Sequence, residues 1–347
     1  MTTTEEARTA VLGAGGPQDL FGPRMPGPAG RRAATRTFRR YAALLHPDRA
    51  GDATAFLRLE ELYRTWADGP DRTAPIVIGR LDAYPVGDLI AQGSVATVYR
   101  GTDTVLKIAR RPAANRLLEN ERAAYRTLAR LTADHEWLRP YYPRLRDVGA
   151  IAGTDGEVRQ VNVLTDLTDG FVTLADVRRA YPQGLDGRDW AWMYRRLLRA
   201  VAGAHRAGLV HGAIVADNVL IQPERHGVVL AGWSFATPAG TKLPARVGSA
   251  DYPPEVTAGR PVTGKSDVHQ LHTLMVALLD WSERDQIRYA RGCLQENPRM
   301  RPPAETLLDE YDELIGRLYG RRRFRPFTLP VTPTNPNDPT TPTNPAV

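Results

Sequence analysis

Two segments near the N-terminus carry apolar side chains at the spacing of amphipathic helices. In the first segment the apolar positions are Phe38, Tyr41, Ala42 and Leu45. In the second segment they are Phe56, Leu59, Tyr63 and Trp66. Both spacings keep the apolar side chains on one face of a helix. Pro47 and Gly51 lie between the segments and exclude one continuous helix. The pattern therefore predicts a helical hairpin with residues 46–48 exposed at its turn.

From residue 86 to about residue 320, strand-like and helix-like segments alternate. Alternating apolar residues flank Gly93 within residues 86–101, and a further strand is predicted over residues 104–109. Three helices follow, with apolar stripes that begin at Leu118, Trp190 and Val268. The order of these segments predicts an α+β domain with a strand-rich first part and a helical second part.

Two opposite charges occupy positions where the pattern expects apolar side chains. Lys107 lies in the middle of the predicted strand 104–109, and it is one of only three lysines in the chain. Glu121 lies on the apolar stripe of the next predicted helix, between Leu118 and Tyr125. A buried carboxylate is costly unless it is paired. We therefore expect Lys107 and Glu121 to pair; the alternative is that Lys107 is a surface lysine on an edge strand.

Composition narrows the classes of protein that remain. The 347 residues include 46 Lys+Arg and 39 Asp+Glu, for a net charge of +7, and the acids are interleaved with the bases. We interpret this charge as a general arginine bias, so nucleic acid is not expected as a partner. The single cysteine excludes a disulfide framework and a zinc–cysteine site, and we expect no metal site. The longest apolar run, residues 274–279, is too short to span a membrane, and a cytoplasmic location is expected.

The chain divides into five regions. We expect a flexible N-terminus at residues 1–16, a helical module at 17–68, a linker at 69–85, the α+β domain at 86–318, and a basic stub with a Pro/Thr-rich tail at 319–347. Prolines recur at every third residue from Pro330 to Pro345, on one face of a polyproline II helix. The tail has nothing apolar to pack, so we expect it to be disordered. The arginines of the stub are candidates for contact with anionic surfaces.

The helical hairpin resembles the J-domain, the module that partners the seventy-kilodalton heat-shock chaperones. The resemblance covers residues 17–68 and rests on a tripeptide and a basic preceding helix: His46, Pro47 and Asp48, with Arg36, Arg39 and Arg40. In that family the tripeptide ends a basic helix and stimulates the chaperone's ATPase. The resemblance implies that these residues contact such a chaperone and that the protein serves an unknown client. The alternative is a plain hairpin in which Pro47 and Asp48 only make the turn.

Residues 76–318 resemble protein kinases and their relatives. The strand "VLKIA" followed by a helix with "ENERAAYRTL" is similar to the phosphate-anchoring lysine and its helix glutamate. Later landmarks follow in kinase order, at residues 161–167, 209–221, 226–237, 252–255 and 265–271. The resemblance implies a bilobal fold with a β-rich N-terminal lobe and a helical C-terminal lobe. It implies nucleotide binding by Gly93, Lys107, Glu121 and Asn218. It also implies structural roles for Asp267 and for a Glu255–Arg301 pair.

The residues that perform phosphoryl transfer in kinases are missing. Kinases take a base from His-Arg-Asp and a metal ligand from Asp-Phe-Gly. The corresponding positions here are Ala213 and Gly232, although Asn218 is retained. Asp217 is a weak substitute for the lost base, and we interpret it as a turn residue. The resemblance therefore implies a pseudokinase with no catalytic residue. ATP remains a candidate ligand, with or without magnesium.

Two functions stay open from the sequence. The first is a J-like co-chaperone or scaffold in which an inactive kinase-like domain binds a client or a nucleotide. The alternative is an active atypical ATP-dependent protein kinase, acting on serine or threonine, or a small-molecule phosphotransferase; it rests on Lys107, Glu121 and Asn218. Binding to nucleic acid through the arginines ranks last, because the chain lacks interleaved aromatic platforms.

Overall fold

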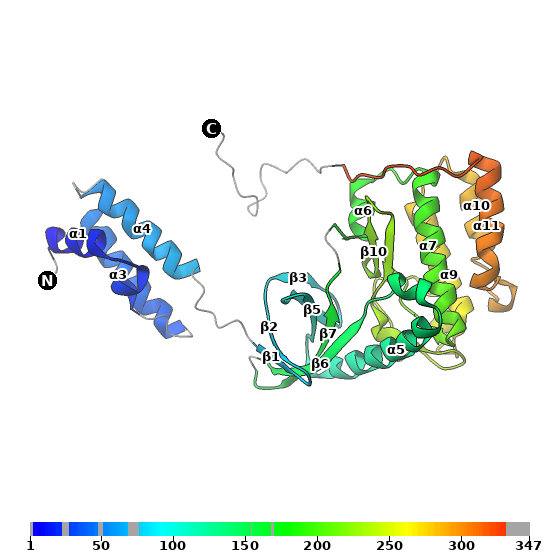
Figure 1. The fold of residues 1–347 in the computed structure, drawn as a ribbon, viewed down its shortest axis with the longest axis horizontal. Helices are drawn as coiled ribbons and strands as arrows, with labels where there is room; N and C mark the ends of the chain where they lie inside the picture. The colour runs from blue at the N-terminus through cyan, green and yellow to red at the C-terminus, as the bar shows by residue number, and fades with distance from the viewer. Residues whose placement is uncertain are drawn as a thin grey trace. The chain divides into compact units, whose positions relative to one another are not determined.

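A computed structural model of the protein describes residues 3–22, 28–47, 51–68, 76–153, 155–167 and 170–330. Asp48 of the hairpin turn and the prolines from Pro333 to Pro345 lie outside the described residues. The chain divides into two compact units, Met1–Ile76 and Val77–Val347 (Figure 1). Each unit buries its own apolar side chains, so each has a separate hydrophobic core.

Helices form the described part of the first unit. These are α1 (Thr4–Gly13), α2 (Pro17–Phe21), α3 (Pro28–Leu45) and α4 (Ala53–Asp68). α3 and α4 are the two helices that the apolar pattern predicts, and they pack against each other. Their stripes meet in a core that includes Leu45, Leu59 and Trp66, each at most 5% exposed. Because Trp66 also donates from Nε1 to the carbonyl oxygen of Gly22 at 3.1 Å, the core extends to the end of α2.

The N-terminus is helical where the sequence suggested flexibility. A capping box begins α1, in which Thr3 and Glu6 satisfy each other's backbone amide. Ala7 and Val11 of α1 are fully buried in the core of the first unit. The expectation of a flexible segment at residues 1–16 is therefore wrong for α1. Two apolar residues four positions apart are enough to bury one face of a short helix, and that signal is too brief to stand out in the sequence.

A seven-stranded sheet forms the first part of the second unit, in the order β2-β1-β6-β7-β5-β4-β3. The strands are β1 (Ile76–Gly79), β2 (Ala83–Pro85), β3 (Leu89–Gln92), β4 (Ala96–Arg100), β5 (Thr104–Ala109), β6 (Leu145–Ala152) and β7 (Val158–Thr165). β4, β5, β7 and β6 form a continuous antiparallel ladder, in which Lys107 of β5 faces Asn162 of β7. The helix α5 (Asn115–Asp134) packs against β6 and β7.

The predicted linker at residues 69–85 extends too far. Its last ten residues contain β1 and β2, which complete one edge of the sheet. Val77 and Tyr84 are buried there against Leu106 and Val161. Asp147 of β6 joins the strands, because its Oδ2 accepts from the Leu81 amide at 2.8 Å and from the Tyr84 hydroxyl at 3.1 Å. The sequence predicted a linker here because Gly and Pro residues, which are typical of turns and linkers, flank these two short strands.

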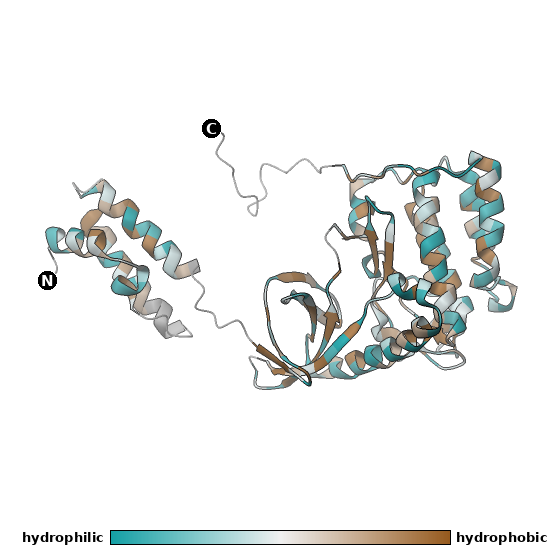
Figure 2. Ribbon diagram, viewed as in Figure 1, coloured by the Kyte–Doolittle hydropathy of each residue, from teal (hydrophilic) through white to brown (hydrophobic). Residues whose placement is uncertain are grey.

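Helices form most of the second part of this unit. The longer ones are α6 (Leu174–Ala180), α7 (Gly187–Arg206), α9 (Gly264–Leu278), α10 (Arg284–Gly292) and α11 (Ala304–Tyr319). Figure 1 shows α7, α9 and α11 running alongside one another, and α7 contacts both of the others. Trp190, Tyr194 and Val201 of α7 are at most 1% exposed, as its apolar stripe predicts. The strands are mostly hydrophobic, whereas these helices mix hydrophobic and hydrophilic turns (Figure 2). The bilobal arrangement expected from the sequence is therefore confirmed.

Short elements connect the two parts and carry the loops of the candidate site. They are β8 (Val172–Thr173), β9 (Leu209–Val210), β10 (Val219–Gln222), β11 (Gly227–Leu230), β12 (Thr237–Pro238) and α8 (Pro254–Thr257), with single-turn helices η2 (Pro112–Ala114), η3 (Glu136–Tyr141), η4 (Ala216–Asn218), η5 (Trp233–Phe235) and η6 (Pro298–Met300). β10 and β11 form an antiparallel hairpin in which Val219 faces Leu230. This pairing brings η4 and η5, which flank the hairpin, close together.

The chain after α11 returns over the helical part instead of leaving it. Phe327 is 3% exposed, and its ring stacks on Tyr181 at 5.6 Å and meets Trp192 edge-on at 5.9 Å. The Tyr181 hydroxyl donates to the Thr328 carbonyl oxygen at 2.7 Å. Figure 1 shows this segment running from α11 back toward α6. The basic stub is therefore docked up to residue 330, where the description of the chain ends.

Candidate functional site

Lys107 and Glu121 form an ion pair between β5 and α5. Lys107 Nζ lies 2.5 Å from Glu121 Oε1, and the two side chains are 14% and 0% exposed. Lys107 is placed by the ladder between β4 and β7, and Glu121 by the buried face of α5. The structure thus brings together the two charges that the sequence pattern singled out. Burial makes each charge depend on the other, because a lone carboxylate here would cost several kcal/mol.

Asn162 holds the second oxygen of the same carboxylate. Its Nδ2 donates to Glu121 Oε2 at 3.0 Å, and its Oδ1 accepts from Arg122 Nε at 2.6 Å. The Tyr125 hydroxyl donates to Glu121 Oε1 at 3.2 Å. Burial, followed by the nearby Glu121 charge, raises the pKa of Tyr125 well above its usual value. Asn162 was not among the predicted site residues, although a polar amide within the apolar strand "VNVLT" was a signal.

Asp267 anchors the loop that follows β9. Its two carboxylate oxygens accept from the backbone amides of His211 at 2.7 Å and Gly212 at 2.8 Å. His205 Nε2 lies 2.9 Å from Asp267 Oδ2. The His211 ring is buried and contacts the Ala231 carbonyl oxygen through Nε2 at 2.8 Å. Burial lowers the pKa of His211, so this imidazole is neutral and has a structural contact rather than a free nitrogen for proton transfer.

Ala213, to which the sequence resemblance assigns the position of the kinase base, lies in apolar surroundings. It is fully buried in a cluster that also contains Val95 beside the glycine turn, Leu118 of α5 and Phe235 of η5. A carboxylate in such surroundings would lose its hydration without gaining a partner. The apolar packing around position 213 therefore suits an alanine and would not suit an acid.

Gly232 lies directly against Asn218. Gly232 has a left-handed backbone, with φ of 78°. A Cβ at this position would come within 2.2 Å of Asn218 Oδ1 and 2.3 Å of Asn218 Cγ. Asn218 Nδ2 donates to the Ala213 carbonyl oxygen at 2.9 Å, which keeps the amide in that place. The space for a metal-binding side chain at position 232 is thus occupied by Asn218 itself.

Gly93 forms a tight turn between β3 and β4. Its amide donates to the Ala96 carbonyl oxygen at 2.9 Å, and its own carbonyl oxygen accepts from Arg110 Nη1 at 3.1 Å. Arg110 follows the strand that carries Lys107. The turn therefore has a cation beside it, although the other glycines of a kinase phosphate loop are absent.

Asp217 lines a separate hollow, whose volume is about 620 Å³. Arg178 and Arg179 of α6 share this lining with Asp251 and with the end of α9. Asp217 therefore faces a mixed-charge surface formed by α6, η4 and the segment before α8. Within the described part of the chain the Asp217 carboxylate makes no hydrogen bond or ion pair, so no contact there supports a role as a base.

Glu255 and Arg301 form a second buried pair that supports the segment before α9. Arg301 donates in a bidentate manner, from Nη1 to Oε1 at 2.6 Å and from Nη2 to Oε2 at 3.0 Å. The Ser266 hydroxyl also donates to Oε1 at 2.8 Å. Burial alone would raise the pKa of Glu255, but the hydrogen bonds from Arg301 and Ser266 outweigh it and lower the pKa.

His46 and Pro47 are the two residues of the expected tripeptide that the structure describes. The His46 ring packs edge-on against Phe56 at 4.9 Å, and its amide donates to the Ala42 carbonyl oxygen at 3.0 Å. Pro47 is exposed, and Asp48 lies outside the described residues. The arginines of α3 that we singled out are all exposed: Arg36, Arg39 and Arg40. Their spacing places them on one face of the helix.

Neither a metal-binding group nor a membrane-spanning helix is found among the described residues. Among the described residues, no group of three or more His, Cys, Asp or Glu side chains is arranged to hold a metal ion. No helix in the described ranges is both long and apolar enough to cross a bilayer.

Comparisons with known proteins point to kinases. No model of a known protein family matches the sequence. The serine/threonine-protein kinase PkaB of Streptomyces coelicolor is 26% identical over 212 residues, covering 56% of this chain and 48% of that protein. The serine/threonine-protein kinase PknF of Mycobacterium tuberculosis is 25% identical over 174 residues, covering 48% of this chain and 35% of that protein. The matched region thus spans half the length of these relatives or less.

A solved structure of vaccinia related kinase 3 has the same fold. It matches with a TM-score of 0.55 and 18% identity, over 71% of this chain and 91% of that chain. The second unit therefore has the protein-kinase fold. The match agrees with the kinase resemblance seen in the sequence.

Proposed function

We propose that the kinase-like unit binds ATP beside the Lys107–Glu121 pair. The pair itself carries the proposal, because it holds a lysine ammonium in a fixed place at a distance of 2.5 Å from its carboxylate. In kinases the equivalent lysine anchors the nucleotide phosphates. Two relatives that are named serine/threonine-protein kinases support nucleotide binding. The hydrogen bond from Asn162 Nδ2 to Glu121 Oε2 helps to keep this carboxylate oriented toward Lys107.

We propose further that this unit binds nucleotide without transferring phosphate in the kinase manner. Ala213 has no group that accepts a proton, and Asn218 fills the space beside Gly232. The donors at positions 218 and 232 therefore do not fit a magnesium ion held as kinases hold it, and we derive no step through one. The unit would then act as a scaffold whose shape responds to nucleotide.

A thermal-shift titration with ATP, with and without magnesium, tests nucleotide binding. A ligand at one hundred times its dissociation constant stabilises the folded state by about 2.7 kcal/mol. The native chain and Lys242→Met, a substitution of an exposed lysine, should melt later with ATP. Lys107→Met should show no shift from its own baseline. A native chain that does not respond to millimolar ATP under either condition would remove the proposal.

An atypical ATP-dependent protein kinase or small-molecule phosphotransferase is the second candidate. The names of the relatives favour it over an inactive unit, and the assembled Lys107–Glu121 pair is compatible with it. Asp217 would be its remaining acid near the loop, on the lining of the 620 Å³ hollow. The comparisons and the residues at positions 213 and 232 thus favour different functions, and activity must be measured.

Incorporation of label from radiolabelled ATP into a broad substrate panel separates the two candidates. If the unit is a scaffold, native protein and Lys107→Met should give equal background. Native incorporation clearly above that of Lys107→Met would establish the second candidate. Asp217→Asn would then show whether that carboxylate takes part.

We propose that the helical first unit contacts a seventy-kilodalton heat-shock chaperone and recruits it to a client held by the larger unit. The exposed arginines of α3 and the turn at His46 and Pro47 support this proposal. A chaperone ATPase assay with the full chain tests it. Stimulation should be lost in His46→Gln and kept in His135→Gln, the same substitution in the other unit. Absence of stimulation by the native chain would refute it.

A further inference from the structure

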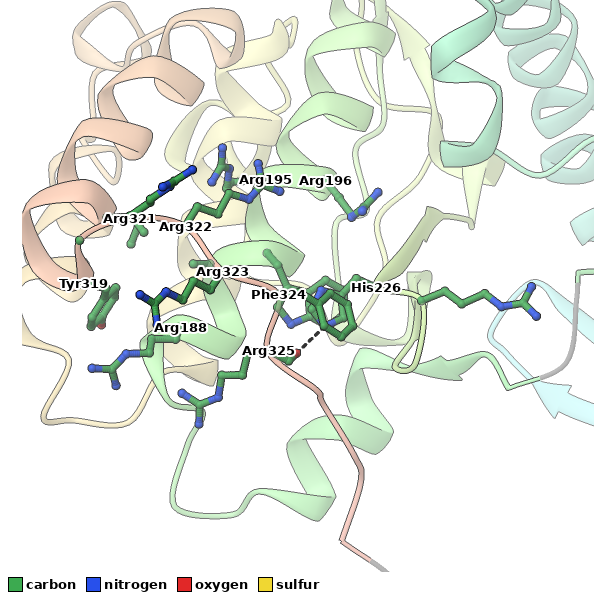
Figure 3. A pocket seen from close by; sticks show the side chains of 15 residues that line it. Arg188, Arg195, Arg196, His226, Tyr319, Arg321, Arg322, Arg323, Phe324 and Arg325 are labelled. Atoms are coloured by element: carbon green, nitrogen blue, oxygen red, sulfur yellow. Dashed lines mark hydrogen bonds between the residues drawn. The ribbon is translucent and has the colours of Figure 1, made fainter.

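A surface cavity in the helical part of the second unit is lined by arginines (Figure 3). Its volume is about 580 Å³, and eight of its fifteen lining residues are arginines. They come from α7, from the turn between β10 and β11, and from the segment that follows α11. We call this cavity the arginine pocket. It is far richer in arginine than the chain as a whole, so general composition does not account for it.

The positive charge of the arginine pocket is only partly balanced. Three of its arginines have carboxylate partners, in the pairs Arg188–Asp186, Arg195–Asp312 and Arg325–Asp189. The guanidinium groups of the other five have no carboxylate partner within the described part of the chain: Arg196, Arg225, Arg321, Arg322 and Arg323. Like charges gathered in this way repel one another, and that repulsion is relieved by a bound anion.

Several charges of the pocket act on one another. Burial lowers the pKa of Arg195, and the guanidinium of Arg322 is among the charges that lower it further. Burial also lowers the pKa of His226, and Arg196 and Arg322 act in the same direction. Figure 3 shows Arg195 and Arg196 on α7 and Arg322 on the segment that follows α11, so two segments of the chain bring these arginines to the pocket.

Aromatic packing holds the wall of the pocket in place. The His226 ring is stacked between Trp192, at 4.0 Å, and Phe324, at 4.4 Å. His226 Nε2 lies 2.8 Å from the Arg325 carbonyl oxygen, so the ring also fixes the backbone of the segment. Phe327 is buried beyond it. The arginines at 321–323 therefore project from a docked segment, which reduces the entropy that a ligand must overcome.

We infer that the arginine pocket binds a small anion that carries several phosphate groups. Guanidinium groups match phosphate oxygens with pairs of parallel hydrogen bonds, which lysines do not provide. Five uncompensated charges exceed what one phosphate neutralises, and the volume is in the range of pockets for small ligands. A nucleic-acid strand fits less well, because the one exposed ring of the wall, Phe324, offers no row of stacking platforms.

Isothermal titration of the full chain with sodium tripolyphosphate at physiological ionic strength tests this inference. The pocket variant is Arg196→Ser/Arg322→Ser/Arg323→Ser. The matched control is Arg116→Ser/Arg291→Ser/Arg299→Ser, which removes the same charge from exposed positions outside the pocket. The pocket variant should lose at least about tenfold in affinity, because several charge-assisted hydrogen bonds are removed. The control should bind as the native chain does.

Two further arms separate this site from other sources of binding. Lys107→Met, shown to be folded by circular dichroism, should keep its affinity for tripolyphosphate, because the arginine pocket shares no residue with the nucleotide site. Loss of binding in the folded variant would assign the anion to the nucleotide site and overturn the inference. A single-stranded oligonucleotide should bind more weakly than tripolyphosphate, and the reverse order would also overturn it. If the triple variant does not fold, Arg322→Ser alone should still weaken binding. Equal affinity of native and pocket variants would refute the proposal.

Discussion

The side-chain amide of Asn218 occupies the place that a side chain on residue 232 would take. A Cβ built on Gly232 would lie 2.2 Å from Asn218 Oδ1, which is far inside van der Waals contact. The Asn218 amide in its present place and a side chain at position 232 therefore cannot occupy this space together. The contact explains why restoring one missing aspartate is not a small change.

Gly232→Asp should therefore destabilise the kinase-like unit and restore no phosphoryl transfer. The left-handed backbone alone costs a non-glycine residue about 1–3 kcal/mol, and displacement of Asn218 adds to it. Gly240→Asp isolates the backbone cost, because Gly240 also has positive φ, at 85°, but nothing lies within 4 Å of its Cβ position. Urea unfolding should rank Gly232→Asp below Gly240→Asp in stability. Equal stability of the two variants would contradict the steric account.

The Lys107–Glu121 pair should show strong non-additivity. Lys107→Met leaves the fully buried Glu121 carboxylate without its cation and should cost about 3–5 kcal/mol. Lys107→Met/Glu121→Met removes both charges and should be more stable than the single variant. Lys242→Met, at an exposed lysine, should change stability by less than about 0.5 kcal/mol. A double variant less stable than Lys107→Met would show that Glu121 does not depend on the pair.

The site residues that could be predicted from the sequence pattern alone are those that interrupt an apolar strand or helix stripe. Lys107 and Glu121 were conspicuous because each charge interrupts an apolar stripe or strand, and their opposite signs suggested each other. Gly232 was found by its place in a kinase-like order of segments. The fit of Asn218 against it was not, because that contact depends on how the β10–β11 hairpin brings η4 and η5 together.

Other features were beyond the patterns used. Asn162 lies 41 residues from its partner Glu121, so only strand register reveals the contact. The docked segment after α11 has one buried ring, Phe327, among arginines and prolines, and a single ring has no periodicity. The sequence therefore predicts elements with repeated apolar positions well. It predicts poorly the short segments whose place is decided by one or two long-range contacts.

His272 should make the stability of the kinase-like unit depend on pH. Burial lowers its pKa to about 4, below the ordinary value of 6.5, and its Nδ1 and Nε2 contact the Val268 carbonyl oxygen and the Tyr194 hydroxyl at 2.6 and 2.8 Å. A depressed folded-state pKa means that its contribution is present in full above pH 6.5. It is lost as the pH falls toward 4, by about 3 kcal/mol.

Urea unfolding between pH 7 and pH 4.5 measures this loss. His272→Leu should be less stable at pH 7, because Tyr194 loses its acceptor, but it should lose less stability on acidification. Some dependence should remain, since the pKa values of His211 and His269 are lowered as well. If the native chain and His272→Leu lost equal stability over this range, His272 would not be titrating as the structure requires.

The helix α1 should be an integral part of the first unit. Val11 is fully buried, whereas its neighbour Leu12 is 43% exposed, so the two positions form a matched pair. Val11→Ala should weaken the unit by about 2 kcal/mol through lost burial and a residual cavity, and Leu12→Ala should have little effect. Hydrogen exchange at the amides of α1, α3 and α4 would report this locally, without depending on the stability of the larger unit. Faster exchange in all three helices of Val11→Ala is expected, because their side chains share one core. If only α1 exchanged faster, or if both variants behaved alike, α1 would be a loosely attached segment instead.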